Sequence, residues 1–169
     1  EVRAILKQEG TTAILVTHDQ NEAFALADEI GIMHAGRIQQ WAAPYDLYHQ
    51  PANRFVADFV GNVNLMDGTV TDDQPSSVTV ACRDCTHYVG HGITGHVDMP
   101  VVVALRPEKI FLSRDEPPGP HNRVRGTVKE MSYYDSFSVY FLELPSCALL
   151  KVSEEHERRH RDDMPTWGD

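Results

Sequence analysis

The sequence predicts an α/β segment over residues 1–61 followed by an all-β domain over residues 62–169. In the first part, a short apolar run at residues 13–16 leads directly into helical periodicity. After Gly61 the pattern changes to alternation of apolar and polar residues between turn signals. A chain that is 41% hydrophobic and 24% charged has a globular composition, so both parts are expected to fold.

The apolar run at residues 13–16 predicts an inner strand of a parallel sheet, buried on both faces. Asp19 followed by Glu22 is a helix-start signature, and the apolar residues from Ala23 onward supply one helical face. His18 is therefore expected at the carboxyl end of a strand, where open α/β sheets place their ligand chemistry. The alternative is a loop histidine without a chemical role.

The other expected elements of the first part are short helices and one hairpin around a tight turn at residues 34–36. They are a helix from Val2 that stops at Gly10, strands at 30–33 and 37–41, a helix from Pro44 that ends at Pro51, and a helix capped by Asn53 that runs through Phe59.

The second part reads as a series of short strands, which predicts a small β-barrel. Strands are expected at 65–70, 78–82, 100–105, 123–133, 137–144 and 148–152, with 110–113 as a possible extension of the sheet. The segment 116–120 is rich in proline, and proline lacks the N–H that a strand ladder needs, so a loop is expected there.

Charge and composition exclude several classes of function. The net charge of −10 gives no basic footprint for nucleic acid, so a nucleic-acid partner is not expected. No apolar run approaches the roughly 18–20 residues of a membrane-spanning helix. Three cysteines without the density of a disulfide scaffold fit a reducing cytoplasm. Residues 1–3 open directly into helical sequence and show no signal peptide. Because the sequence begins with Glu1 rather than Met and is already helical there, we expect the chain to be part of something longer.

The stretch VTHDQNEAFALADEIGIMHAGRIQQWAAPYDLYHQPANRFVADFVG, residues 16–61, resembles the end of the nucleotide-binding domain of ABC-importer ATPases, most closely the polyamine (spermidine/putrescine) type. In that family the histidine of VTHD is the switch histidine, which contacts the γ-phosphate of ATP and helps position the attacking water. The resemblance gives this role to His18, with Asp19 capping the helix behind it. Residues 1–61 would then be an α/β remnant of a P-loop ATPase domain.

Residues 62–169 resemble the TOBE domain of the same importers, an OB-like barrel. The segments that carry the resemblance are NLMDGTV, ALRPEKI and RGTVKEMSYYDSFSVYFLELPS, while LKVSEEHERRHRDDMPTWGD is similar to the putrescine-type proteins in particular. Cys147 stands where those proteins usually have glycine. We expect the barrel to be incomplete at its end, with an exposed edge that invites pairing with another chain.

The resemblance implies ATP and Mg²⁺ as cofactors of the complete subunit, membrane permease subunits and a second copy as partners, and a peripheral position on the cytoplasmic face of the membrane. The chain lacks the glycine-rich P-loop pattern, the LSGGQ signature and the strand ending in Asp-Glu, so it is not expected to hydrolyse ATP alone. The alternative is a regulatory or dimerisation module without catalysis, whose barrel binds a small ligand or a partner.

Further candidate sites lie in the second part. Cys82 and Cys85 form a C-x2-C pair that, with His87 and His91, has the donor types of a zinc site. The competing interpretation is a flexible loop with unrelated histidines, and the resemblance implies no metal.

Three more groups of residues have two interpretations each. Arg106 and Glu108 are candidates for an effector pocket, or a structural ion pair. Tyr133, Tyr134 and Phe137 form either a stacking platform or hairpin packing. The charge run at 156–163 is a contact surface or a solvated segment.

Overall fold

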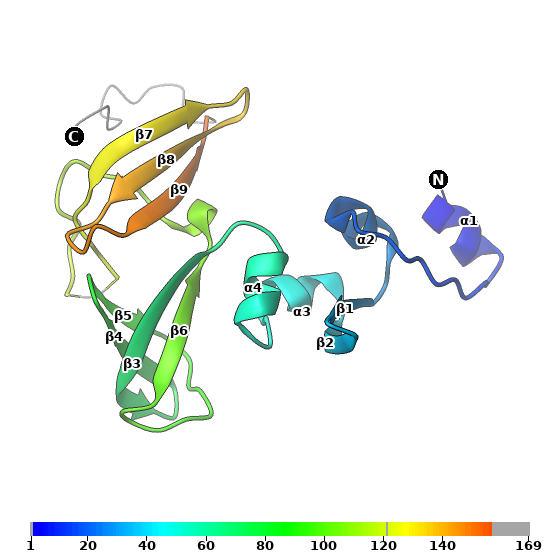
Figure 1. Ribbon diagram of the computed structural model, residues 1–169, viewed down its shortest axis with the longest axis horizontal. Helices are drawn as coiled ribbons and strands as arrows, with labels where there is room; N and C mark the ends of the chain where they lie inside the picture. The colour runs from blue at the N-terminus through cyan, green and yellow to red at the C-terminus, as the bar shows by residue number, and fades with distance from the viewer. Residues whose placement is uncertain (1, 121, 157–169) are drawn as a thin grey trace. The chain divides into compact units, whose positions relative to one another are not determined.

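The computed structural model describes residues 2–120 and 122–156. The chain divides into two compact units, residues 1–61 and 62–169 (Figure 1). Among the described residues, no helix has both the length and the apolar character needed to cross a membrane.

The first unit contains four short helices and one hairpin. In chain order the elements are α1 (Val2–Gln8), α2 (Gln20–Leu26), β1 (Ile30–His34), β2 (Arg37–Ala42), α3 (Pro44–His49) and α4 (Arg54–Phe59). The β1–β2 turn places Ala35 and Gly36 at φ 47° and 74°, the left-handed pair that a tight hairpin turn requires. Behind the hairpin, a small core gathers Ile32, Leu47 and Val56, each no more than 4% exposed.

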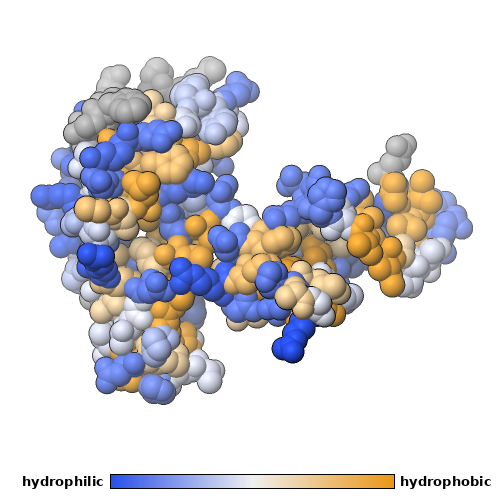
Figure 2. Space-filling view, viewed as in Figure 1, coloured by the Kyte–Doolittle hydropathy of each residue, from blue (hydrophilic) through white to orange (hydrophobic). Residues whose placement is uncertain are grey.

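The predicted buried strand at residues 13–16 is wrong for this structure. The segment is irregular, and Ile14 and Val16 are 91% and 92% exposed. Figure 2 shows the apolar surface around α1 and the segment that follows it. A parallel strand is buried only when neighbouring strands and covering helices are present. Among the described residues of this unit, β1 and β2 form the one strand pair, so the predicted ATPase-type α/β layer is not formed.

Both predicted helix caps in the first unit are confirmed. The Asp19 carboxylate accepts hydrogen bonds from the backbone N–H groups of Asn21 and Glu22, at 2.8 and 3.2 Å. The side chain of Asn53 accepts from the N–H of Val56 at 3.0 Å, at the start of α4. These contacts satisfy N–H groups that have no partner within the helix, which is why acidic and amide side chains begin helices.

Replacing Asp19 with alanine is expected to weaken the first turn of α2 by about 1 kcal/mol, because two backbone N–H groups lose their acceptor. Hydrogen exchange at Asn21 and Glu22 measures the loss as faster exchange. Asp19→Asn keeps an oxygen acceptor and should exchange like the parent chain. Equal exchange in all three chains would contradict the capping role.

Within its described residues, the second unit contains two antiparallel sheets. Its elements are β3 (Asn64–Gln74), β4 (Ser77–Cys82), β5 (Thr86–Val89), β6 (Pro100–Leu105), the 3₁₀ turn η1 (Pro107–Lys109), β7 (Thr127–Tyr133), β8 (Phe137–Glu143) and β9 (Leu149–Glu155). The first sheet has the order β5-β4-β3-β6 and the second the order β7-β8-β9 (Figure 1).

The second unit differs from the sequence prediction in three ways. No strand ladder joins the two sheets within the described part of the chain, so the closed barrel is not observed. Residues 110–113 form no strand, although Ile110 and Leu112 pack against the core of the second sheet. The short strand β5 was not predicted, since THYV offers too few alternating apolar positions to reveal it.

Each sheet has its own apolar core, and polar side chains connect the two sheets. Val70, Val78 and Val80 are the buried centre of the first sheet. Val128, Tyr140 and Val152 lie in the centre of the second. Two side chains of the first sheet and its β4–β5 turn, Asn64 and Asp84, hydrogen-bond to the backbone of the second sheet and its β8–β9 turn.

Candidate functional site

His18 is exposed and lies between the irregular segment and the first turn of α2. The chain is turned at this point by Thr17, whose hydroxyl accepts from the N–H of Asp19 at 3.0 Å, and by the Asp19 cap that follows. The sequence therefore places a solvent-facing imidazole directly before a capped helix start. All other predicted site residues lie in the second unit, so none of them joins His18 within its own unit.

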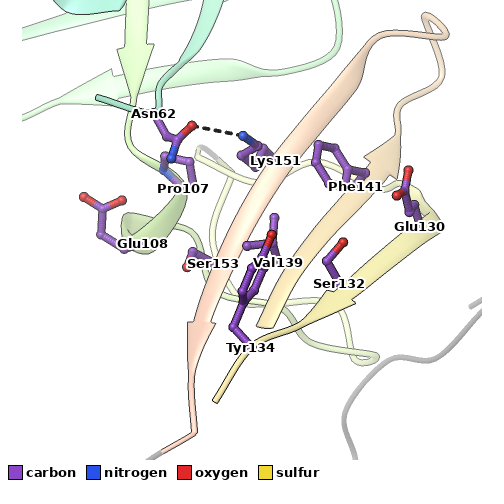
Figure 3. Close-up of a pocket in the computed structure, with 10 residues that line it drawn as sticks. All are labelled: Asn62, Pro107, Glu108, Glu130, Ser132, Tyr134, Val139, Phe141, Lys151 and Ser153. Atoms are coloured by element: carbon purple, nitrogen blue, oxygen red, sulfur yellow. Dashed lines mark hydrogen bonds between the residues drawn. The ribbon is translucent and has the colours of Figure 1, made fainter. Parts of the chain in front are cut away.

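The second unit carries an open cleft of about 300 Å³ between η1 and one face of the β7-β8-β9 sheet (Figure 3). The face is formed by alternate residues of the three strands, because side chains on a strand alternate between the two sides of a sheet. The residues that line the cleft are Asn62, Pro107, Glu108, Glu130, Ser132, Tyr134, Val139, Phe141, Lys151 and Ser153.

Lys151 is the central cation of this cleft. Its Nζ donates to the side-chain oxygen of Asn62 at 3.0 Å and lies 5.5 Å from the centre of the Phe141 ring (Figure 3). Its backbone is fixed by the buried Asn64, which accepts from the Lys151 N–H and donates to the Lys151 carbonyl, both at 2.8 Å. The ammonium group is thus held by one hydrogen bond to Asn62 beside an aromatic face, while Asn64 fixes only the backbone of the residue.

The cleft offers hydrogen-bonding groups of both kinds. The carboxylates of Glu108 and Glu130 accept, Lys151 donates, and the hydroxyls of Ser132 and Ser153 do either. Val139 and Phe141 are the apolar side chains of strand β8 that line the cleft. Such an arrangement can hold a small polar ligand.

Arg106 and Glu108, the predicted regulatory pair, have different positions. Arg106 is 9% exposed, and its guanidinium donates to the carbonyl of Asn62 at 3.1 Å. This hydrogen bond connects Asn62, at the start of the second unit, to the residue that follows β6. Glu108 is exposed and lines the cleft. A ligand would therefore meet Glu108 directly.

The zinc candidates come together only in part. Cys85 Sγ lies 3.1 Å from His87 Nε2, while His91 Nδ1 lies 3.1 Å from the carbonyl of Gly92. Burial raises the pKa of both the Cys82 and the Cys85 thiols and lowers the pKa of His87. No group of three metal-ligating side chains is gathered among the residues that the structure describes.

The three aromatic residues of the predicted stacking platform do not form one stack but belong to two separate ring pairs. Tyr134 stacks on Phe137 with ring centres 4.8 Å apart, whereas Tyr133 stacks on His156 at 4.4 Å. His156 is the only member of the predicted 156–163 charge run that the structure describes, and residues 157–163 lie outside the described residues.

The sequence prediction missed Asn62, Phe141 and Lys151 as members of one cleft. A signal was present, because alternation along 149–155 places Lys151 and Ser153 on one face and Leu150 and Val152 on the other. The contribution of Asn62 could not be seen, since it lies 89 residues from Lys151 in the sequence.

Comparisons with known proteins add the following. The sequence profile of the TOBE domain matches residues 103–169. The chain is 36% identical over 171 residues to a putrescine transport ATP-binding protein of Escherichia coli, covering 100% of this chain and 45% of that protein. It is 36% identical to a spermidine/putrescine import ATP-binding protein of Thermobifida fusca, covering 83% of this chain and 36% of the relative. A protein of the same name from Chromobacterium violaceum is 35% identical, with 91% and 43% covered. The chain thus spans less than half the length of these relatives.

Proposed function

We propose that this chain is the carboxyl-terminal part of the ATP-hydrolysing subunit of an ABC importer. Two findings support the proposal: the match to the TOBE domain profile and the similarity to polyamine-importer ATP-binding proteins. Residues 1–61 complete the nucleotide-binding domain, and residues 62–169 form the accessory β-domain. The solute is a polyamine, in keeping with the names of the relatives.

The observation that carries this proposal is the similarity over the whole chain to one class of protein, at 36% identity in the putrescine relative. The similarity spans both units. The segment around His18 and the β-domain therefore follow each other in this chain as they do in the relative. In the complete subunit His18 would contact the γ-phosphate of ATP, and Mg²⁺ would be bound with the nucleotide. The subunit then works with permease subunits and a second copy of itself at the inner face of the membrane.

The exposed apolar segment at residues 13–16 supports the same proposal. Its side chains are suited to a buried strand, yet Ile14 and Val16 face solvent. The relatives are more than twice as long as the matched part, so they contain sequence that can supply neighbouring strands. In the complete subunit this segment joins the parallel sheet and places His18 at its carboxyl edge.

A second candidate function is favoured by the cleft around Lys151. An open pocket with acidic, basic and hydroxyl groups fits a regulatory module that binds a small polar ligand without catalysis. This function would require neither nucleotide nor His18.

A chimera separates the two functions. This chain replaces the matching carboxyl-terminal part of the Escherichia coli putrescine transport ATP-binding protein, and ATP-dependent putrescine uptake is measured with the relative's own permease. We expect uptake to be restored. A chimera that assembles with the permease and binds ATP but supports no uptake would overturn the proposed function and leave the regulatory module.

A further inference from the structure

Cys82 and Cys85 lie opposite each other at the closed end of the β4–β5 hairpin. The ladder pairs Val80 with His87 and Ala81 with Thr86, so residues 82 and 85 are the next pair in register. The N–H of Cys82 donates to the carbonyl of Cys85 at 3.0 Å, which continues the ladder by one more contact. The two cysteines are therefore directly opposed cross-strand neighbours.

This placement satisfies the main requirement for a disulfide. Directly opposed residues of antiparallel strands have Cα atoms about 4.5–5.5 Å apart. Disulfides join residues whose Cα atoms are roughly 4.4–6.8 Å apart. Opposed side chains also project from the same face of the sheet.

We propose that Cys82 and Cys85 are a reversible dithiol–disulfide pair that exchanges with small-molecule disulfides. The pair accounts for the C-x2-C motif without a metal ion. It is independent of the importer function proposed above, because it involves only the β4–β5 hairpin.

The surroundings identify Cys85 as the attacking thiol. Its Sγ lies 3.1 Å from His87 Nε2, which accepts the thiol proton when the ring proton is on Nδ1. Burial lowers the pKa of His87, which favours the neutral imidazole that has this acceptor available. Burial, Cys82 and Asp84 raise the pKa of Cys85, and burial and Asp67 raise that of Cys82. Exchange should therefore be slow at neutral pH and faster in alkali, where more thiolate is present.

The exchange proceeds in two balanced steps. The Cys85 thiolate attacks one sulfur of the small-molecule disulfide, which forms a mixed disulfide and releases one thiol. The Cys82 thiolate then attacks the Cys85 sulfur and releases the second thiol. The two cysteines lose two protons and two electrons, the reagent is reduced to two thiols, and those thiols receive the protons.

The cysteine turn also connects the two sheets of the second unit. Asp84, between the cysteines, accepts from the Ser146 N–H at 2.9 Å and from the Ser146 hydroxyl. Ser146 lies in the turn between β8 and β9. A Cys82–Cys85 bond would lock the turn that presents the Asp84 carboxylate and so limit the motion of this connection.

The test is incubation of the full chain with oxidised glutathione and a metal chelator, followed by intact mass and peptide mapping. We expect one product in which Cys82 and Cys85 are joined and have lost two hydrogen atoms, and in which dithiothreitol restores both thiols. The exposed Cys147 provides an internal comparison and should carry glutathione instead.

Two variants sharpen the test. Cys82→Ser should stop at a mixed disulfide on Cys85, whereas Cys147→Ser should still form the Cys82–Cys85 bond. Circular dichroism checks that both variants are folded, and peptide mapping of the parent chain decides the matter if Cys82→Ser is not. Glutathione on both Cys82 and Cys85, a bond to Cys147, or free thiols at both positions while Cys147 reacts would each overturn the proposal.

Discussion

Replacing Asn64 with leucine is expected to lower the free energy of unfolding of the second unit by about 3 kcal/mol. Asn64 is 8% exposed, and its amide makes hydrogen bonds to the carbonyl of Leu105 and to both backbone groups of Lys151. Leucine has a similar size but neither donates nor accepts. The variant leaves the Lys151 N–H and the carbonyls of Leu105 and Lys151 without these partners, and each unpaired group costs about 1–3 kcal/mol where it is shielded from water.

Urea denaturation followed by circular dichroism measures the loss of stability, and hydrogen exchange at the Lys151 amide locates it. Asn62→Ala is the matched control two residues away. Asn62 is exposed and its side-chain oxygen accepts from the Lys151 ammonium, an exposed contact, so this variant should cost under about 1 kcal/mol. If Asn64→Leu were no less stable than Asn62→Ala, the connecting role of Asn64 would be disproved.

Replacing His18 with alanine in a complete subunit is expected to lower kcat for ATP hydrolysis by about 100-fold or more, the lower range for a group that assists proton transfer or water positioning. The nucleotide KM should change little, because the proposed contact is to the phosphate that is transferred and acts mainly in the transition state. Steady-state hydrolysis and binding of a fluorescent ATP analogue measure the two quantities separately.

His34→Ala is the matched control for His18→Ala. His34 is also an exposed histidine of the first unit, and it packs on Phe55 with ring centres 4.1 Å apart. Its removal should leave kcat near that of the parent subunit. An equal decrease in both variants would indicate loss of folding, and an unchanged kcat in His18→Ala would refute the switch role.

Local sequence signals predicted most elements of both units because their causes are local. Asp19 and Asn53 cap helices through contacts to N–H groups two or three residues away. The Ala35-Gly36 turn determines its own hairpin, because both residues adopt positive φ. The predicted strand at residues 13–16 failed for a different reason. Its apolar sequence requires neighbouring strands that the described chain does not supply.

By itself, the sequence determined the helix caps, the hairpin turns, most of the strands and the position of His18 before a capped helix. Tertiary structure alone decided that the β-strands of the second unit form two sheets and that Asn62 meets Lys151, 89 residues away in the sequence. It also placed Asp84 against Ser146, which lies 62 residues away in the sequence. The physical reason is that caps and turns depend on neighbouring residues, whereas a cleft or a cross-strand pair depends on the register and packing of distant strands.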